Sequence, residues 1–256
     1  MHAVVPVAGL GTRLLPLTRV VPKALLPLDD RPVVQHIVDE LLAVGISCVW
    51  LVVRPEGPAI EEQFAGDPRI RVLHQPKPLG LGDAIARAAP VIGDDPFVVA
   101  LGDGVFRTPA ALRALLGAFG VDRRATGAIA VERVPRERLA RCGVLSVEGS
   151  RVVGIVEKPA PEEAPSDLAV AARYVLSREI FDALRSVEPG PDGEIGLTEA
   201  LARLIADGRR VLAVPLPEGE RRYDVGDPNG YAEAFVEFAL ARDAGLAERV
   251  RGAGER

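Results

Sequence analysis

The residues best suited to chemistry lie in a glycine-rich loop, Ala8–Pro27, that directly follows the apolar run Ala3–Val7. Gly9 and Gly11 lack side chains, so backbone N–H groups there can approach phosphate oxygens closely. Prolines stiffen the rest of the loop, which carries three cations: Arg13, Arg19 and Lys23. Such a loop can cradle a triphosphate and neutralise charge that develops during phosphoryl transfer. The alternative is a strand-to-helix turn with incidental surface cations.

Two common phosphate-binding motifs do not fit this loop. A dinucleotide-binding fingerprint requires a third glycine where Leu14 stands, followed at once by a helix. Three prolines prevent a long helix here: Pro16, Pro22 and Pro27. A Walker loop requires Gly-Lys before Ser or Thr, which is absent. The Gly-x-Gly-Thr-Arg pattern, followed by a lysine in the same loop, therefore indicates another kind of phosphate site.

Two further turns follow predicted strands and carry polar side chains. Gln75 and Gly80 lie in a turn that opens a predicted helix, whose N-terminus favours anions, although a plain turn explains this pattern equally well. Asp103 follows the apolar run Phe97–Leu101, and a carboxylate there suits a hard cation beside phosphates. A turn cap explains Asp103 equally well. Since a metal site requires more than one ligand, we expect a second carboxylate elsewhere.

The segments Gly9–Pro16 and Pro22–Pro27 closely resemble the signature of the sugar-1-phosphate nucleotidylyltransferase family. Within it, the chain looks most like the bacterial UTP–glucose-1-phosphate uridylyltransferases, or UDP-glucose pyrophosphorylases. The resemblance extends from Val4 to about Leu240. It implies nucleotidyl transfer from a nucleoside triphosphate, with UTP expected, to a sugar 1-phosphate, with glucose 1-phosphate expected, and release of pyrophosphate.

The resemblance implies a nucleotide site with a metal beside it. The first loop would bind the nucleotide through Ala8, Gly9, Gly11, Thr12 and Arg13. Gln75 and Gly80 would recognise the base. Asp103 would contact both the nucleotide and the Mg²⁺ cofactor, with Asp224 as the second metal ligand. Asp227 is better explained as the N-cap of the last helix.

A second group of motif residues is implied to bind the sugar phosphate: Gly143, Glu157, Lys158 and Lys23. The glutamate would bond sugar hydroxyls and the adjacent lysine would hold the phosphate; a surface salt bridge between them is the alternative. Cys142 stands where the family usually has an aromatic residue. Glu194 and Thr198 could cap the following helix or border the sugar pocket. An ionised phosphate nucleophile requires no strong protein base, so catalysis depends on alignment and on neutralisation of charge. Arg13 and Lys23 are therefore the expected catalytic cations.

Short apolar runs that alternate with amphipathic segments must position these residues. In the first half of the chain, four runs predict buried strands: Ala3–Val7, Cys48–Val53, Ile70–Leu73 and Phe97–Leu101. The segments between and after them predict helices over Val33–Val44, Leu81–Ala89 and Ala110–Phe119. Strands separated by helices indicate a Rossmann-like, mostly parallel sheet flanked by helices. Ligands of such sheets bind at the carboxyl ends of the strands.

The second half has shorter connections and predicts antiparallel additions to the same sheet. Its expected strands are Ala128–Glu132, Val144–Val147, Val152–Val156, Ala169–Leu176 and Val211–Val214. Its expected helices are Arg178–Leu184, Leu197–Ala206 and Pro228 to about Ala241. The fold class is α/β with an α+β sugar-binding extension, the nucleotide-diphospho-sugar transferase fold. We expect one domain over residues 1–242, with a nucleotide-binding half (about 1–125), a sugar-phosphate-binding half (126–242) and a frayed polar tail (243–256).

Composition excludes several classes of partner. A net charge of -5 with dispersed basic residues argues against nucleic-acid binding. No run approaches the roughly 20 apolar residues that cross a bilayer, and no export signal is evident, so we expect a cytoplasmic protein without a membrane partner. Cys48 and Cys142 are the only cysteines, and a structural disulfide between them is not expected.

Several alternatives stay open. The base and sugar are undetermined, so thymidylyl, adenylyl or guanylyl transfer to glucose 1-phosphate or a modified sugar phosphate is an alternative. A non-catalytic regulatory subunit is disfavoured because both expected catalytic cations and both aspartates are present. A glycosyltransferase usually carries Asp-x-Asp, whereas Val105 stands two positions after Asp103. Compared with typical uridylyltransferases, the chain is shorter between Phe64 and Ile70 and at its C-terminus. These differences could alter contacts in a homo-oligomer or mark a specialised enzyme that uses a modified sugar phosphate.

Overall fold

The computed structural model describes residues 1–55 and 59–254 of the chain. Its centre is a nine-stranded sheet in the order β5-β4-β1-β6-β11-β8-β12-β10-β9. The first four strands in that order are mutually parallel. They are β1 (His2–Pro6), β4 (Cys48–Val53), β5 (Ile70–His74) and β6 (Phe97–Ala100). The predicted parallel sheet is therefore confirmed, with each strand end within a residue of its expected place.

The second half of the chain completes the same sheet. Its strands are β8 (Ala125–Arg133), β9 (Gly143–Glu148), β10 (Arg151–Glu157), β11 (Leu168–Leu176) and β12 (Arg210–Pro215). β11 lies antiparallel between β6 and β8, and β12 then pairs parallel with β8. β10 is antiparallel to both β12 and β9. Within this sheet β11 and β10 run opposite to the others, so the sheet is mostly parallel with the expected antiparallel extension.

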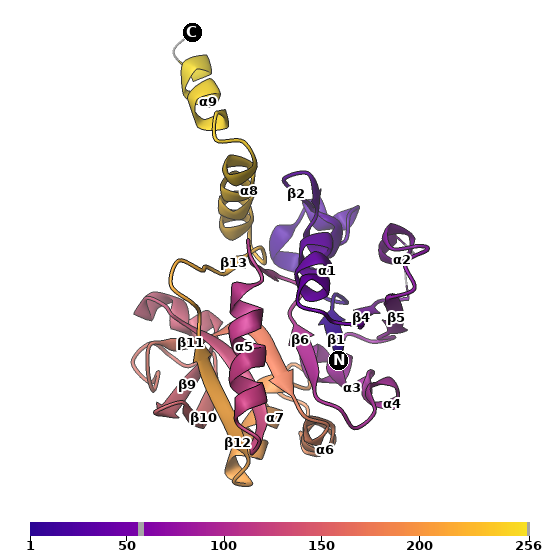
Figure 1. Cartoon of the computed structure of the whole chain (residues 1–256), viewed down its shortest axis with the longest axis vertical. Coiled ribbons are helices and arrows are strands. Elements are labelled where there is room, and N and C mark those ends of the chain that lie inside the picture. Colours follow the sequence, from indigo (N-terminus) through magenta and orange to yellow (C-terminus); the bar gives the residue numbers. More distant parts are fainter. Residues whose placement is uncertain (56–58, 255–256) are drawn as a thin grey trace.

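Helices cover both faces of the sheet (Figure 1). Along β1, Ala3 and Val5 pack into a core cluster with α1 (Val33–Ala43) and α5 (Ala110–Val121). Val4 points to the opposite face, which packs against α3 (Gly80–Ala86), α6 (Glu179–Ser186) and α7 (Leu197–Ala206). A strand buried on both faces requires apolar residues at every position, which is why these strands appear in the sequence as continuous apolar runs.

Two predicted segments differ from the structure. The helix expected over Leu81–Ala89 is divided into α3 and α4 (Ala89–Ile92), because Pro90 has no N–H to continue the helical hydrogen bonds. The tail expected to be frayed instead forms α9 (Leu246–Gly254), beyond α8 (Pro228–Arg242). Asp243 stabilises the start of α9, since its carboxylate accepts the Gly245 N–H and pairs with Arg249. Figure 1 shows α9 projecting away from the body.

Smaller elements complete the described chain. α2 (Ala59–Gln63) precedes β5, and β2 (Pro27–Leu28) pairs with β3 (Arg31–Pro32). A two-stranded ladder joins β7 (Gly104–Val105) to β13 (Tyr223–Asp224). Cys48 and Cys142 are free thiols, as expected. Over the ranges that the structure describes, no helix is both long and apolar enough to cross a bilayer.

Candidate active site

A cavity of about 380 Å³ lies at the carboxyl ends of β1, β5 and β6. This is the edge at which open α/β sheets bind ligands. The cavity brings together predicted site residues from four segments: Ala8, Gly9, Gly11, Thr12, Lys23, Gln75, Gly80 and Asp103. The predicted nucleotide-binding residues therefore share one space, with the exception of Arg13.

The loop after β1 folds into three 3-10 turns: η1 (Thr12–Leu14), η2 (Leu17–Arg19) and η3 (Lys23–Leu25). Gly11 has a left-handed backbone, with φ of 65°, and its carbonyl oxygen accepts a 2.8 Å hydrogen bond from Thr18 Oγ1. A Cβ at position 11 would lie 3.0 Å from Thr18 Cγ2 and 3.2 Å from Lys23 Cβ. Glycine is thus required here both by conformation and by space, and the loop holds Lys23 close beneath it.

Gln75 is a buried polar residue of the cavity wall. Its Nε2 donates to the Gly80 carbonyl at 3.0 Å and to Asp83 Oδ2 at 2.9 Å. Asp83 is held in turn by Arg87 at 2.7 Å. Because both amide hydrogens of Gln75 are used, Oε1 is the amide atom that can accept a hydrogen bond from a ligand.

Lys23 and Asp103 form an ion pair inside the cavity, with Nζ 2.9 Å from Oδ2. Desolvation favours the neutral acid, but the charge and hydrogen bond of Lys23, together with the charge of Arg222, outweigh it and hold the pKa of Asp103 below its usual value. Asp103 is therefore ionised at neutral pH, with 43% of its side chain exposed. An anionic ligand and a cation can both reach this pair.

Asp224 reaches the same place from a distant part of the chain. The ladder between β13 and β7 sets Asp224 opposite Gly104, and the Val225 N–H donates to the Asp103 carbonyl at 2.9 Å. The backbone of Gly226 lies between the two carboxylates. A Cβ there would be 2.8 Å from Asp224 Oδ1 and 3.5 Å from Asp103 Oδ2. The two predicted metal ligands thus face one small space.

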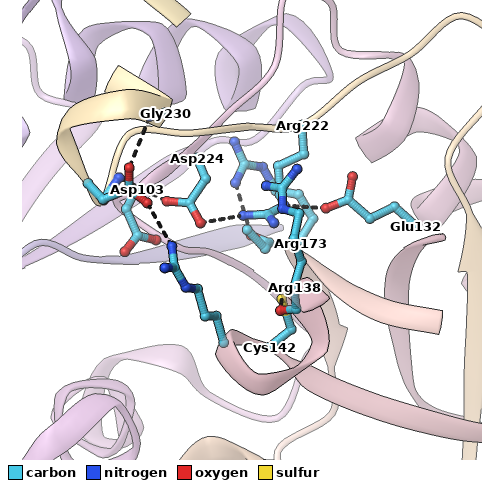
Figure 2. Close-up of polar contacts among 12 residues, drawn as sticks. Asp103, Glu132, Arg138, Cys142, Arg173, Arg222, Asp224 and Gly230 are labelled. Carbon is cyan, nitrogen blue, oxygen red and sulfur yellow. Dashed lines mark hydrogen bonds and ion pairs between the residues drawn. The ribbon is translucent and has the colours of Figure 1, made fainter. Parts of the chain in front are cut away.

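A buried arginine holds Asp224 from the opposite side (Figure 2). Arg222, with 9% of its side chain exposed, donates from Nε to Glu132 Oε1 at 2.6 Å and from Nη1 to Asp224 Oδ2 at 3.3 Å. Desolvation opposes the charged guanidinium, but Glu132 and Asp224 outweigh it and raise the pKa of Arg222 above its usual value. Arg222 therefore stays charged and fixes the orientation of Asp224.

The two carboxylates fit a hard divalent cation that shares its ligands with phosphate. Such a cation usually keeps waters and binds one or two protein carboxylates plus phosphate oxygens. Among the residues that the structure describes, no group of three or more His, Cys, Asp or Glu could hold a metal. Asp103 and Asp224 would thus supply only part of a coordination shell, and nucleotide phosphates would supply more of it. Lys23 would share Asp103 with the cation.

Three of the four predicted sugar-phosphate-binding residues, Gly143, Glu157 and Lys158, lie at or beside the ends of β9 and β10, whereas Lys23 lies in the main cavity with Asp103. Thr198 Oγ1 donates to Glu157 Oε2 at 2.7 Å, and a Cβ at Gly143 would lie 3.4 Å from the same oxygen. Lys158 Nζ lies 3.2 Å from Glu157 Oε1, so the ion pair considered from the sequence is present. The Lys158 backbone is left-handed, with φ of 44°, and its N–H donates to the Cys142 carbonyl at 2.9 Å. A strained non-glycine residue is typical of a functional position.

Neither Glu194 nor Thr198 caps a helix. The N-cap of α7 is Gly196, and it receives no side-chain hydrogen bond. Thr198 instead contacts Glu157, and Glu194 lines the main cavity beside Gly80. Asp227 does cap α8 as predicted, since its carboxylate accepts the N–H groups of Asn229 and Gly230.

Arg13 lies outside the main cavity. It lines an adjacent hollow of about 290 Å³ together with Lys158 and three residues not predicted there: Ala140, Arg141 and Asp227. The two predicted catalytic cations therefore lie in different places, Lys23 within the cavity and Arg13 at the hollow. The hollow also joins the first loop to Lys158 of the predicted sugar-phosphate site.

The sequence interpretation missed several residues that support the site. Asp83 holds Gln75, and its place in the first turn of a helix after the Gln-Pro segment was a usable signal. Glu132 and Arg222 are 90 positions apart in the chain, so no local pattern joins them. Their contact follows only from the sheet and from the ladder between β7 and β13.

Comparisons with known proteins agree with this geometry. The model of the Nucleotidyl transferase family matches residues 2–240. A UTP–glucose-1-phosphate uridylyltransferase of Bacillus subtilis is 37% identical over 272 residues, covering 94% of this chain and 90% of the relative. A protein of the same name from Streptococcus pneumoniae is 36% identical over 273 residues, covering 93% and 90%.

Solved structures are similar over the same extent. A UDP-glucose pyrophosphorylase complexed with UDP-glucose has a TM-score of 0.85 and 30% identity, covering 93% of this chain and 97% of that chain. A UTP-bound UGPase from Acinetobacter baumannii has a TM-score of 0.84 and 30% identity, covering 94% and 93%. Because the family match runs from β1 through most of α8 and includes every residue of the cavity wall, this chain belongs to the nucleotidyl transferase family.

Proposed function

We propose that this protein transfers the uridylyl group of UTP to glucose 1-phosphate, forming UDP-glucose and pyrophosphate, with Mg²⁺ as its metal cofactor. The observation that carries the proposal is the single cavity in which the Ala8–Thr12 loop, Lys23, Gln75 and Asp103 meet. Relatives named as uridylyltransferases at 36–37% identity support the choice of UTP and glucose 1-phosphate.

The base is expected at Gln75. Its Nε2 is engaged by Gly80 and Asp83, so Oε1 can accept a hydrogen bond from a ring N–H of the base. Uracil offers such an imide N–H, whereas adenine has no ring N–H on its pairing edge. The triphosphate would then extend along the backbone of the loop after β1, with Lys23 near its α-phosphate.

Catalysis of the transfer depends on alignment of the two substrates and on neutralisation of phosphate charge. An oxygen of glucose 1-phosphate attacks the α-phosphorus of UTP, and the bond to the pyrophosphate oxygen breaks, so that pyrophosphate leaves with the electron pair. The attacking phosphate is already ionised at neutral pH, and no histidine or free carboxylate is needed as a base. Lys23 would neutralise charge between the substrates, Arg13 the leaving group, and Lys158 the attacking phosphate.

Metal and sugar contacts complete the assignment. Asp103 and Asp224 would hold Mg²⁺, which when bound neutralises phosphate oxygens and favours in-line geometry. Glu157 would accept hydrogen bonds from sugar hydroxyls, with Thr198 orienting it. The Gly143 backbone lies beside the same carboxylate.

A matrix of nucleoside triphosphates against sugar 1-phosphates, with detection of pyrophosphate, tests the proposal. The expected result is Mg²⁺-dependent release that is greatest with UTP and glucose 1-phosphate. Asp103→Asn should lower kcat by about a hundredfold or more, since it removes an anionic ligand of the proposed Mg²⁺ that neutralises the transferring phosphate. Asp94→Asn is the control, because Asp94 is an exposed carboxylate outside the cavity wall. Full activity of Asp103→Asn, or greatest turnover with another pair of substrates, would contradict the proposal.

A further inference from the structure

The hollow beside the nucleotide cavity contains more positive charge than the proposed mechanism uses. Its lining includes three cations and one carboxylate: Arg13, Arg141, Lys158 and Asp227. Arg13 and Lys158 already have expected phosphate partners, whereas Arg141 has none. A concave surface with a surplus of positive charge favours a multiply charged anion.

The structure positions Arg141 rather than leaving it as a free surface side chain. Arg141 is the last residue of η4 (Arg136–Arg141), and its Nη1 lies 3.5 Å from Asp227 Oδ2. Asp227 is itself fixed, because its Oδ1 accepts the N–H groups of Asn229 and Gly230 at the start of α8. The N-cap residue of α8 thus fixes the position of the Arg141 guanidinium. In Figure 2, the turn that carries Arg138 and Cys142 lies opposite Asp103 and Asp224.

Most of the hydrogen-bonding capacity of Arg141 is open to a ligand. Its side chain is 71% exposed, and the contact to Asp227 engages one nitrogen of a guanidinium that carries five N–H donors. A planar guanidinium can bind two phosphate oxygens at once, and a second arginine of the same kind, Arg13, lines the same hollow.

We infer that Arg141 binds pyrophosphate, together with Arg13, and is a further substrate-binding residue of this site; the inference rests on the proposed function. Arg13 directly follows Thr12 of the nucleotide cavity, so the hollow opens beside the triphosphate. Lys158 pairs with Glu157 and is directed toward the sugar side. Pyrophosphate carries more negative charge than a phosphate monoester, which fits the two guanidinium groups, of Arg13 and Arg141, that remain in the hollow.

The reverse reaction measures this contact directly. An oxygen of pyrophosphate attacks the α-phosphorus of UDP-glucose, the bond to the glucose 1-phosphate oxygen breaks, and glucose 1-phosphate leaves with the electron pair while UTP forms. The KM for pyrophosphate then measures binding at the hollow, and the KM for UDP-glucose measures binding at the rest of the site.

Arg141→Ala should raise the KM for pyrophosphate about tenfold, the loss expected for one charge-assisted phosphate contact. Arg141→Lys should give an intermediate value, because a lysine retains the charge without the planar fork. Arg138→Ala is the matched control. Arg138 lies on the same 3-10 helix but does not line the hollow. The main-chain carbonyl of residue 138, which accepts a hydrogen bond from the Cys142 thiol, is unchanged by the substitution. The KM of Arg138→Ala for pyrophosphate, and the KM of all variants for UDP-glucose, should change less than twofold.

Three results would overturn the inference. An unchanged KM for pyrophosphate in Arg141→Ala would show that Arg141 does not contact pyrophosphate. An equal rise of this KM in Arg138→Ala would show that the effect comes from general surface charge. A rise confined to the KM for glucose 1-phosphate in the forward direction would assign Arg141 to the other substrate.

Calorimetric titration with pyrophosphate and Mg²⁺ separates this inference from the proposed function. If the native protein catalyses neither direction, the proposed function fails. Weaker pyrophosphate binding by Arg141→Ala than by Arg138→Ala would still support the contact, whereas equal binding, or no binding to the native protein, would overturn it.

Discussion

Gly80 and Gly45 have nearly the same backbone conformation, with φ of 92° and 87°, but different surroundings. A Cβ at Gly80 would lie 2.7 Å from Glu194 Cβ and 2.8 Å from the Ile195 carbonyl oxygen, at the wall of the proposed nucleotide cavity. A Cβ at Gly45 would meet nothing within 4 Å. The two positions therefore separate the cost of backbone strain from the cost of lost space at the site.

Gly80→Ala should raise the KM for UTP at least about tenfold, because Glu194 and Ile195 must shift at the cavity wall to make room for the added methyl group. Gly45→Ala should lower the free energy of unfolding by about 1 kcal/mol, through backbone strain alone, and leave the KM unchanged. Urea unfolding and steady-state kinetics of both variants test this. Equal KM values in the two variants would show that the wall at Gly80 does not limit nucleotide binding.

At the scale of the elements, an irregularity in β11 carries a buried charge. Pairing with β8 shifts between Val170 and Tyr174, and Ala172 has φ of 58°. Arg173 turns into the core, where its guanidinium pairs with Glu40 of α1 at 2.6 and 3.2 Å. The Ala172 carbonyl accepts the Leu101 N–H at 3.0 Å, directly before the loop that carries Asp103. The ion pair therefore joins α1 to β11, and the Leu101 hydrogen bond joins β11 to the end of β6.

Glu40→Gln should lower the free energy of unfolding by about 3 kcal/mol, because it leaves the fully buried Arg173 without its counter-charge. Asp39→Asn, on the same helix, breaks an exposed pair with Arg31 and should cost no more than about 1 kcal/mol. Denaturant midpoints of the two variants give the comparison. Similar losses in both would mean that water reaches the Arg173 site.

The contact between α1 and α8 should depend on pH. His36 Nε2 lies 2.8 Å from the Leu28 carbonyl oxygen, and its ring packs against Phe238 with centroids 5.0 Å apart. Desolvation lowers the pKa of His36 below 6.5, although the hydrogen bond to Leu28 opposes the shift. The unfolded state then binds more protons than the folded state between the two pKa values, so stability rises with pH across that window.

His36→Gln should therefore flatten the dependence of stability on pH. The contribution of His36 is complete above its unfolded pKa, near 6.5, and is lost as pH falls from there through the folded value. Denaturant unfolding between pH 5 and 8, compared for the two proteins, should show the steeper decline toward acid in the native protein. Parallel profiles would mean that His36 keeps the same pKa in both states.

At the scale of the whole molecule, the sheet could be predicted because its central parallel strands, such as Cys48–Val53, are continuous apolar runs. The cavity could be predicted because parallel strands bring Gln75 and Asp103 to one edge. The link from Arg222 to Glu132 could not, since it joins positions 90 apart that carry no shared pattern. Nor could the polar segment of α9 be recognised, because its helix depends on contacts of Asp243 rather than on an apolar face.

The projection of α9 from the body leads to a prediction for the full chain (Figure 1). Isolated helices shorter than about 12 residues are marginal in water, and α9 spans Leu246–Gly254. Ending the chain after Gly245 should therefore change the free energy of unfolding by less than about 1 kcal/mol and leave kcat and the KM for UTP unchanged.

Phe238→Ala is the comparison within the preceding helix. Its ring packs against Tyr223, beside Asp224, with centroids 5.4 Å apart, so its removal should cost about 3 kcal/mol and lower turnover. Unfolding curves, kinetics and sedimentation of both variants make the test. A loss of about 3 kcal/mol on truncation, with a change in sedimentation, would show that α9 is covered by a second copy of the chain and is not an appendage of α8.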